Sequence, residues 1–305
     1  MEAQPQFDRY RGRFAPTPSG PLHFGSLVAA VASYADARSR AGAWCLRIDD
    51  LDPPRVARGA SADILRTLEA LGMEWDGPVV YQSRRADAYH AALHRLRALG
   101  AAYLCGCSRR EIAEAGIAGM EGTVYPGTCR RGLAPRIRAR AWRVNTCGQR
   151  PVGFHDDIQG ETTQDLAHSI GDFVLYRADR VYAYHLAAVI DDAEEGITHV
   201  VRGADLLDST PRQILLQTLL GLPTPRYAHI PVATDATGEK LSKQTGATAL
   251  DTHAPGRTVA AALRFLGQGE PPAECDNDVQ ALWQWAIAHW DIERVPKAKV
   301  SPASR

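Results

Sequence analysis

The first part of the chain alternates between short apolar runs typical of β-strands and longer segments with the spacing of helices. Arg13 to Ala15 resembles a strand end, and an Ala-rich helical run from Leu27 to Ala37 follows a turn rich in proline and glycine. A second apolar strand, Trp44 to Ile48, precedes helical patterns from about Ala57 to Leu71 and from about Arg84 to Leu99. Strands that alternate with helices pair in parallel, so this order predicts an α/β fold with helices on both faces of a parallel sheet.

This pattern breaks from about Tyr103 to Arg140, where cysteine, glycine and arginine dominate, and we interpret that segment as an inserted module. Alternation resumes near Trp142. The later elements that we expect are a strand or buried helix over each of Val181 to Ile190 and Thr198 to Val201, a helix from Ser209 to Leu220 and a helical tail from Leu250. We expect the last ten residues to be unstructured.

The composition excludes some classes of protein. The chain has 35 basic and 35 acidic residues, and a net charge of zero argues against a protein that coats nucleic acid nonspecifically. No stretch reaches the roughly 18 consecutive apolar residues of a membrane span, and the polar start from Met1 to Arg9 lacks the apolar segment of a secretory signal. We therefore expect a cytoplasmic protein with its six cysteines reduced or metal-bound. We also expect a monomer, although no motif in the sequence bears on the oligomeric state.

Two short motifs far apart in the chain point to nucleotide chemistry. Pro18 to Ser26 is a turn that opens a helix, where Gly25 lets the backbone approach a nucleotide and the helix N-terminus favours phosphate. Lys240 to Gln244 holds two of the four lysines in a chain whose other basic residues are all arginine. Either motif alone is typical of an ordinary turn or an exposed loop. In this order, and with His23, they predict a site that binds ATP and expels pyrophosphate, because fixed cations stabilise the charge that develops there.

Polar residues at the expected strand ends form a second candidate set. Ligands of parallel sheets bind beyond the carboxyl ends of the strands, and Arg13 and Asp49 fall at that rim. Arginine binds carboxylate in a bidentate manner and aspartate accepts from ammonium, so Arg13, Asp49, Tyr184 and Arg202 suit an amino acid with two carboxylates. Ordinary strand-end ion pairs are the alternative, which the spacing alone favours.

The inserted module carries a candidate metal site. Cys105 and Cys107 lie two residues apart, and Cys129 follows four residues after Tyr125. Such cysteines in a cytosolic loop indicate structural zinc, with Tyr125, Cys147 or water as the fourth ligand, although free thiols remain the alternative.

Two charged clusters have less specific interpretations. The arginines between Arg130 and Arg143 either contact nucleic acid or form a solvated face, and the residues leave both open. The acidic pairs Asp191-Asp192 and Glu194-Glu195 resemble a solvated helix end, and we expect no acid–base role for them.

These motifs resemble those of a known enzyme family. His23-Phe24-Gly25-Ser26 is similar to the HIGH signature of class I aminoacyl-tRNA synthetases, and Lys240 to Gln244 is similar to their KMSKS signature. Three more segments resemble the glutamyl/glutaminyl subgroup: Arg13 to Thr17, Arg47 to Asp52 and Val201 to Leu206. The likeness spans roughly Arg11 to Lys243 and implies a Rossmann-like parallel-sheet catalytic domain.

On that basis the chain divides into four parts. These are the first half of the catalytic domain (1–102), a zinc-binding insertion (103–140), the second half of the catalytic domain (141–232), and a region with the Lys240 to Gln244 loop and a short helical C-terminal piece (233–305).

Within the subgroup the chain is most similar to the glutamyl-queuosine tRNA(Asp) synthetases. It ends soon after Gln244, which leaves no room for the anticodon-binding domain of a glutamyl-tRNA synthetase, and its second motif ends in Gln as in that family. The resemblance makes Tyr125 the expected fourth zinc ligand beside Cys105, Cys107 and Cys129.

The resemblance also implies roles for individual residues. The glutamate pocket would consist of Arg13, Ala15, Thr17, Asp49, Tyr184 and Arg202. The residues facing ATP would be His23, Gly25, Ser26 and Lys243, and the catalytic set His23, Gly25, Lys240 and Lys243. Two positions depart from the family, since Asp49 replaces the usual Glu and His185 stands where Asn is expected.

The implied activity is ligation. The chain would activate L-glutamate with ATP and Mg²⁺ without tRNA, and then transfer glutamate to the queuosine base in the anticodon of tRNA(Asp). A truncated glutamyl-tRNA synthetase that charges a tRNA 3′ end is a rival of the same class. A catalytically inactive nucleotide- or tRNA-binding regulator is a rival of another class, against which the presence of both Lys240 and Lys243 argues.

Overall fold

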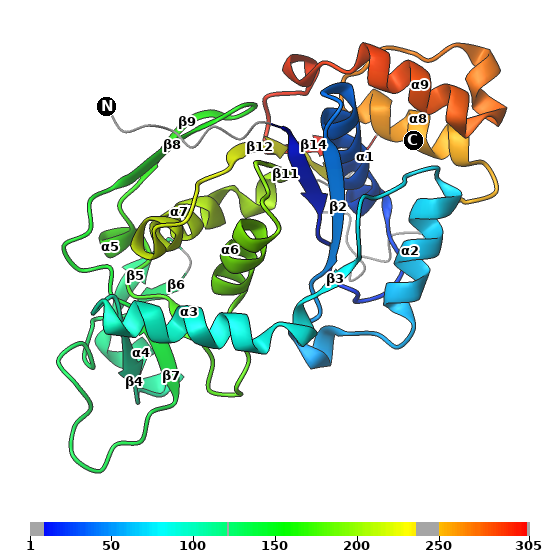
Figure 1. Cartoon of the computed structure of the whole chain (residues 1–305). Coiled ribbons are helices and arrows are strands. Elements are labelled where there is room, and N and C mark those ends of the chain that lie inside the picture. The colour runs from blue at the N-terminus through cyan, green and yellow to red at the C-terminus, as the bar shows by residue number, and fades with distance from the viewer. Residues whose placement is uncertain (1–8, 121, 236–249, 304–305) are drawn as a thin grey trace.

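The computed structural model describes residues 9–120, 122–235 and 250–303 (Figure 1). The strands in these ranges are β1 (Arg11–Phe14), β2 (Ala43–Ile48), β3 (Val80–Tyr81), β4 (Ala102–Cys105), β5 (Ile117–Gly119), β6 (Gly122–Val124), β7 (Ala141–Val144), β8 (Val152–Asp156), β9 (Gly160–Gln164), β10 (Val174–Tyr176), β11 (His199–Gly203), β12 (Arg226–Ile230), β13 (Val232–Thr234) and β14 (Val300–Pro302). The α-helices are α1 (Phe24–Ser39), α2 (Ala60–Ala70), α3 (Ala86–Ala98), α4 (Arg109–Ala115), α5 (Leu166–Ser169), α6 (Tyr184–Glu194), α7 (Thr210–Leu220), α8 (Pro255–Phe265) and α9 (Val279–His289). Within these ranges no helix is long and apolar enough to cross a membrane.

Parallel strands form the centre of the fold, as the sequence predicts. β1 pairs with β2, β2 with β3 and β11 with β12, all in parallel. β11 lies beside β1, where the backbone N–H of Thr198 donates to the carbonyl of Arg11 at 2.9 Å (Figure 1). The strand order is therefore β3-β2-β1-β11-β12, and the winding reverses between β1 and β11. Sheets of this kind bind ligands beyond the carboxyl ends of the strands at such a reversal.

Alternate side chains of β2 show that helices cover both faces of this sheet. Trp44, Leu46 and Ile48 belong to the apolar core that also contains the inner face of α1. Cys45 belongs to a separate cluster, and Arg47 reaches acidic side chains of α6. Because successive strand residues point to opposite faces, α1 and α6 lie on opposite sides of the sheet.

Helix α1 is buried almost all round because it lies between two layers. One side contacts β1, β2 and β11, and the other contacts α8 and α9. On α9, the indole N–H of Trp283 donates to the carbonyl of Leu71 at 2.8 Å, and beyond that helix Trp290 donates to the carboxylate of Asp36 at 3.1 Å. The predicted helical tail is thus confirmed, and it covers the helix that begins at the His23 motif.

Most of the predicted elements in this part of the chain are confirmed. The strand over Trp44 to Ile48 is β2, and the helices predicted from Ala57 and from Arg84 are α2 and α3. The segment Val181 to Ile190, which the sequence leaves between strand and helix, contains the start of α6 at Tyr184.

The prediction of unstructured last residues is wrong for those that the structure describes. β14 pairs in parallel with β13, with Val300 opposite Val232. The backbone N–H of Val232 donates to the carbonyl of Lys299, and that of Ala303 donates to the carbonyl of Thr234. All of these hydrogen bonds join main-chain groups, which every sequence has. The side chains from Pro296 to Pro302 are mostly polar or small and show no strand pattern, so the sequence did not indicate β14.

The cysteine-bearing segment is held to the rest of the chain by a second sheet. β7 pairs antiparallel with both β4 and β10, while β5 and β6 form a hairpin of their own. β4 ends at Cys105, so its pairing with β7 attaches the start of the cysteine-bearing segment to strands further along the chain. The domain limits that we drew from the sequence stay a prediction.

Candidate active site

The carboxyl ends of β1 and β2 meet beside the start of α1. The backbone N–H of Asp49, just after β2, donates to the carbonyl of Pro16 at 3.0 Å. The N–H of Ala57 donates to the carbonyl of Pro18 at 2.9 Å. Ala15 and Thr17 therefore lie on a loop fixed beside Asp49, at the edge where the winding of the sheet reverses.

His23 caps the N-terminus of α1. Its ring nitrogen Nδ1 accepts from the backbone N–H of Ser26 at 3.4 Å, so in the neutral ring Nε2 carries the proton. Gly25 and Ser26 form the first turn, which contains no acidic residue. Unpaired backbone N–H groups at such a terminus attract phosphate. Lys240 and Lys243 lie outside the described residues.

Arg202 is held from behind by a buried chain of hydrogen bonds. On β11 it stands opposite His229 of β12, and its Nε donates to Nε2 of His229 at 3.0 Å. Nδ1 of His229 in turn donates to the carboxylate of Asp156 at 2.5 Å. All three side chains are buried, so each hydrogen bond fixes the direction of the next group.

The protonation states of this chain are set by burial and by neighbouring charge. Burial lowers the pKa of His229 to about 4, although its hydrogen bond to Asp156 opposes the shift. Burial disfavours the charged form of Asp156, but its hydrogen bonds lower its pKa, with that from His229 foremost. At neutral pH the pair is therefore a neutral imidazole beside a carboxylate, and Nε2 of His229 is free to accept from Arg202.

The outer edge of Arg202 faces Tyr184. Nη1 donates to the Tyr184 hydroxyl at 3.2 Å, and Nη2 donates to Thr210 and Gln213, each at 2.8 Å. Among the described residues Nη1 has no other partner. One of its two N–H groups therefore remains available to an incoming acceptor.

A second buried network surrounds Arg47. This fully buried guanidinium lies 2.8 Å from Asp49, 2.6 Å from Asp192 and 3.4 Å from Glu195. Arg13 reaches the same carboxylate of Asp192 through its Nε at 3.3 Å. One carboxylate of α6 thus joins two strands of the sheet.

Charge and burial compete in this network. Burial raises the pKa of Asp49 to about 6, although the charge of Arg47 opposes the rise. Burial also disfavours ionised Asp192, but there Arg13 and Arg47 prevail and its pKa is lowered. Asp49 therefore has the higher pKa of the two carboxyl groups. A positive charge placed beside it would stabilise its ionised form.

Our interpretation of the four acids at the end of α6 as a solvated helix end is wrong for Asp191, Asp192 and Glu195, and holds only for Glu194, whose side chain is exposed. Asp191 is fully buried and accepts from Gln82, Arg85 and Tyr89, and Asp192 is 7% exposed. Four acids so close in sequence have the pattern of a solvent-facing surface. Their arginine partners lie on other elements, so no local signal reveals the pairing.

The structure brings the predicted amino-acid residues to one edge of the sheet. Arg13 of β1 and Arg202 of β11 lie on neighbouring strands, and Asp49 shares with Arg13 the network around Arg47 and Asp192. Two guanidinium groups and one carboxylate therefore border the same region. His185, next to Tyr184, lies 3.2 Å from Arg212, and burial lowers its pKa to about 3, so it is neutral there.

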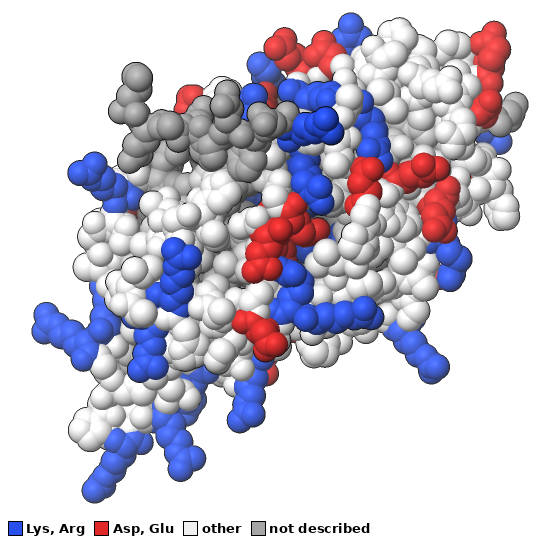
Figure 2. Space-filling model, in the orientation of Figure 1, with Lys and Arg blue, Asp and Glu red and all other residues white. Residues whose placement is uncertain are grey.

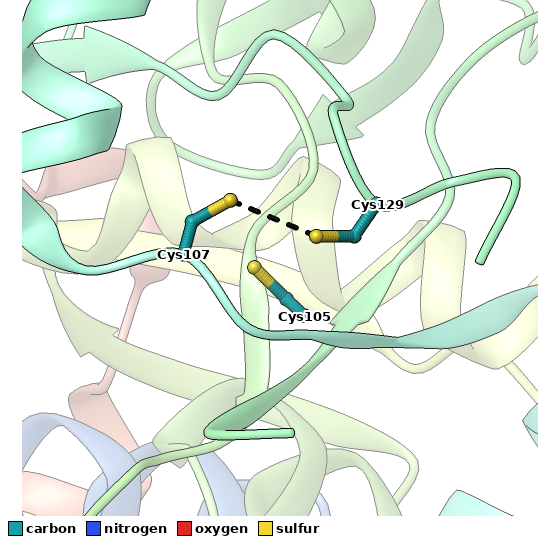
Figure 3. Close-up of side chains that lie close together, drawn as sticks. All are labelled: Cys105, Cys107 and Cys129. Carbon is teal, nitrogen blue, oxygen red and sulfur yellow. Dashed lines mark hydrogen bonds between the residues drawn. The ribbon is translucent and has the colours of Figure 1, made fainter. Parts of the chain in front are cut away.

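The three cysteines of the insertion come together (Figure 3). Their sulfur atoms lie within 4.8 Å of one another, and those of Cys107 and Cys129 are 3.6 Å apart. The Tyr125 hydroxyl lies 3.4 Å from the sulfurs of Cys105 and Cys107 and accepts from the backbone N–H of Cys129. Three thiols and a phenol around one point form a donor set that could hold zinc. Cys147 is exposed and is not part of this group.

The arginine run of the insertion divides into two sets. Arg130 pairs with buried Asp172 at 2.6 Å, and Arg143 lies over the Tyr125 ring, 4.2 Å from its centroid. Both hold the cysteine segment to the chain around β10. The remaining arginines of the run, Arg131, Arg136, Arg138 and Arg140, are exposed.

Comparison with known proteins agrees with this geometry. A family model described as tRNA synthetases class I (E and Q), catalytic domain, matches residues 9–259. The chain belongs to this family. It is therefore a ligase of the aminoacyl-tRNA synthetase type, and the class implies ATP and Mg²⁺.

Two relatives from the family are more than half identical to the chain. A glutamyl-Q tRNA(Asp) synthetase of Chromobacterium violaceum is 56% identical over 94% of this chain and 95% of its own length. One of Aromatoleum aromaticum is 54% identical over 94% of this chain and 91% of its own length. The synthetase described here is thus similar to both along nearly its whole length.

Solved structures give the same fold. A glutamate tRNA ligase from Elizabethkingia meningosepticum, in complex with its amino acid, has a TM-score of 0.80 and 26% identity. The match covers 97% of this chain and 67% of that one. A Mycobacterium tuberculosis methionyl-tRNA synthetase is 15% identical with a TM-score of 0.54, which shows the shared class I fold alone.

The cysteine geometry predicts one zinc ion per chain. Replacing Cys105 and Cys129 by serine removes two of the three sulfur ligands, so elemental analysis of the purified variant should find no zinc. Cys45→Ser, which changes a buried cysteine outside the group, should keep a full equivalent. Zinc should also be lost at acidic pH, because thiolate ligands take up protons. Full occupancy in the double variant would rule out this site.

Proposed function

We propose that this synthetase activates L-glutamate with ATP to glutamyl-adenylate and transfers the glutamyl group to the queuosine base at the wobble position of tRNA(Asp). The charge pattern at the sheet edge is the observation that carries the activation step. Glutamate has two carboxylates and one ammonium, and Arg13, Arg202 and Asp49 offer the complementary two cations and one anion. The acceptor is inferred from the names of relatives that match over nearly their full length.

The glutamate pocket would consist of Arg13, Ala15, Thr17, Asp49, Tyr184 and Arg202. Arg202 would bind one carboxylate through the N–H that Tyr184 leaves available, and Arg13 would bind the other. Asp49 would accept from the ammonium. Its side chain is one methylene shorter than that of the family's Glu, so a bridging water would fill the gap.

ATP would bind at the N-terminus of α1. His23 would donate from Nε2 to phosphate because its Nδ1 is engaged by Ser26, and Gly25 would let the backbone approach. Lys240 and Lys243, which lie outside the described residues, would complete the catalytic set. Mg²⁺ bound with ATP supplies charge neutralisation on the phosphates.

The reaction then needs no covalent enzyme intermediate. A carboxylate oxygen of glutamate bonds to the α-phosphorus of ATP while the bond to the bridging oxygen breaks, and pyrophosphate leaves with the electron pair. A hydroxyl of queuosine next attacks the carbonyl carbon of the adenylate, and the bond from that carbon to the AMP oxygen breaks. An ester forms, and AMP leaves with the electron pair while its phosphate takes up the hydroxyl proton. The role of the site residues is to hold charge where it develops. We expect an enzyme that uses ATP and tRNA in this way to work in the cytoplasm. We also still predict that the protein is a monomer.

Asp49 should control glutamate affinity and its pH dependence. Asp49→Ala should raise KM for glutamate by about ten- to a hundredfold, the value of a hydrogen bond to a charged group, and leave KM for ATP unchanged. Asp49→Glu should bind glutamate as well or better. Because the pKa of Asp49 is about 6, its carboxylate takes up a proton below that pH and no longer attracts ammonium.

In the unchanged enzyme, KM for glutamate should therefore rise by about tenfold per pH unit below 6, and this component should be absent from Asp49→Ala. Asp50→Ala is the matched control, because that carboxylate bonds Ser83 instead. Equal effects of Asp49→Ala on glutamate and ATP would remove Asp49 from the amino-acid pocket.

His229 should act as a positioning residue for Arg202. His229→Leu removes the acceptor of the Arg202 Nε proton, so KM for glutamate should rise by about tenfold or more while KM for ATP holds. His229→Gln retains an amide oxygen as acceptor and should recover part of the affinity. Circular dichroism separates this effect from unfolding. A folded His229→Leu enzyme with normal KM for glutamate would contradict the role.

The acceptor prediction separates the two synthetase activities. An adenylate reacts with any well-placed hydroxyl, so the substrate must be tested directly. Labelled glutamate should be transferred to tRNA(Asp) that lacks its 3′ CCA end, provided that queuosine is present, and not to the same tRNA with guanosine at the wobble position. Loss of charging on CCA removal, or equal charging of the guanosine form, would favour a glutamyl-tRNA synthetase that charges the 3′ end.

A further inference from the structure

We infer that a continuous row of ring and guanidinium side chains beside α3 binds unpaired bases of the RNA substrate by stacking. This inference rests on the proposed function, because the RNA enters the argument there. The row, which we call the stacking row, consists of Tyr176, Tyr182, His90, His94, Trp142 and Arg97.

The six side chains touch one another in sequence. The rings of Tyr176 and Tyr182 lie with centroids 4.8 Å apart, and the Tyr182 hydroxyl is 3.4 Å from Nδ1 of His90. The His90 and His94 rings are 4.3 Å apart. His94 lies 5.7 Å from Trp142, and the Arg97 guanidinium lies 5.3 Å from the Trp142 ring centroid.

The row is open to solvent along one side. His90, His94 and Arg97 are exposed and share one face of α3, because residues four and seven apart on a helix lie above one another. Trp142 of β7 and the two tyrosines are half-buried, and their inner sides pack on the core around α3 and α6. The rings are tilted against one another by 51–57°, so they do not stack on each other fully. Core packing accounts for the inner sides of Trp142 and the tyrosines but requires no exposed imidazoles beside them.

The chemistry of the row fits nucleobases. Aromatic rings, imidazoles and arginine planes are the groups on which proteins stack splayed-out RNA bases. A base has a π-face whatever its identity, so a row of such groups can hold several bases without reading each of them. The anticodon loop is the part of a tRNA whose bases can leave the helical stack.

The row also connects two regions that such an RNA would have to reach. Tyr182 precedes Tyr184, the proposed contact of glutamate, by two residues. At the other end, Trp142 follows the exposed arginines Arg138 and Arg140 of the insertion. No ion pair within the described chain engages Arg131, Arg136, Arg138 or Arg140. Figure 2 shows basic side chains projecting from the end of the molecule that Figure 1 labels α4, β4 and β7. Phosphates can bind there while bases follow the row toward the site.

The test compares RNA binding by matched variants. His90→Ala/His94→Ala removes two exposed rings and no buried one. By fluorescence anisotropy, its Kd for the anticodon stem–loop of tRNA(Asp) should be about tenfold or more higher than that of the unchanged protein. The dependence of Kd on salt should be unchanged, because the double variant removes rings and leaves every arginine and lysine in place.

Two further variants make the comparison specific. His90→Phe/His94→Phe keeps the flat rings and should restore binding. His289→Ala removes an exposed histidine that stacks on Trp285 at 4.9 Å on α9, far along the chain from the row, and should bind RNA normally. Thermal unfolding of each variant reports whether it is folded.

Each outcome decides between the claims. Normal RNA binding by folded His90→Ala/His94→Ala would overturn the stacking row and leave the proposed function intact. An equal loss of affinity for a fully paired RNA duplex would overturn it as well, since the rings would then not hold unpaired bases. If the unchanged protein binds a stem–loop that carries queuosine but does not charge it with glutamate, the proposed acceptor fails while the row is still tested by binding.

Discussion

The buried guanidinium of Arg47 is the constraint on which the amino-acid site depends. It lies on the face of the sheet opposite α1, where an unpaired charge could not stay buried, and Asp49, Asp192 and Glu195 surround it. Removing one partner from such a group typically costs about 3–5 kcal/mol. The arrangement therefore fixes β2 against α6, and with them Asp49 and Arg13, the two groups that we propose to contact glutamate.

Arg202 is positioned by a different principle. Its partner on the neighbouring strand is a neutral imidazole, which accepts one hydrogen bond because Asp156 fixes the proton on the far nitrogen. A carboxylate directly against Arg202 would neutralise it and weaken its pull on a substrate carboxylate. With His229 between them, the guanidinium keeps its direction and most of its positive field. Arg13 is thus oriented by an anion, the carboxylate of Asp192, whereas Arg202 is oriented by a neutral acceptor, the imidazole of His229.

The sequence predicts those features that are local in the chain. The strand over Trp44 to Ile48 and the helix after His23 follow from spacing over a few residues, and the cysteine cluster follows from three cysteines within one segment of 25 residues (105–129). The structure confirms each of them. The α6 acids and the pairing of β14 were predicted wrongly because their partners are remote in sequence. The relay behind Arg202 left no signal either, since a lone buried histidine is ordinary in a core. Lys240 and Lys243 lie outside the described residues, so the second motif remains a sequence argument.

Helix α3 joins the chemistry to the surface. On its inner side, Arg85 just before the helix and Tyr89 within it bond Asp191, and Asp191 lies 3.6 Å from Arg47. On its outer side, the next residue after Tyr89 is His90, the midpoint of the stacking row. A shift of α3 caused by RNA on the row would move the partners of Asp191, and through Arg47 it would change the field at Asp49. An adenylate could react with many hydroxyls, and this link would tie the site to one RNA, because the helix with the proposed RNA contact also supports the proposed amino-acid pocket.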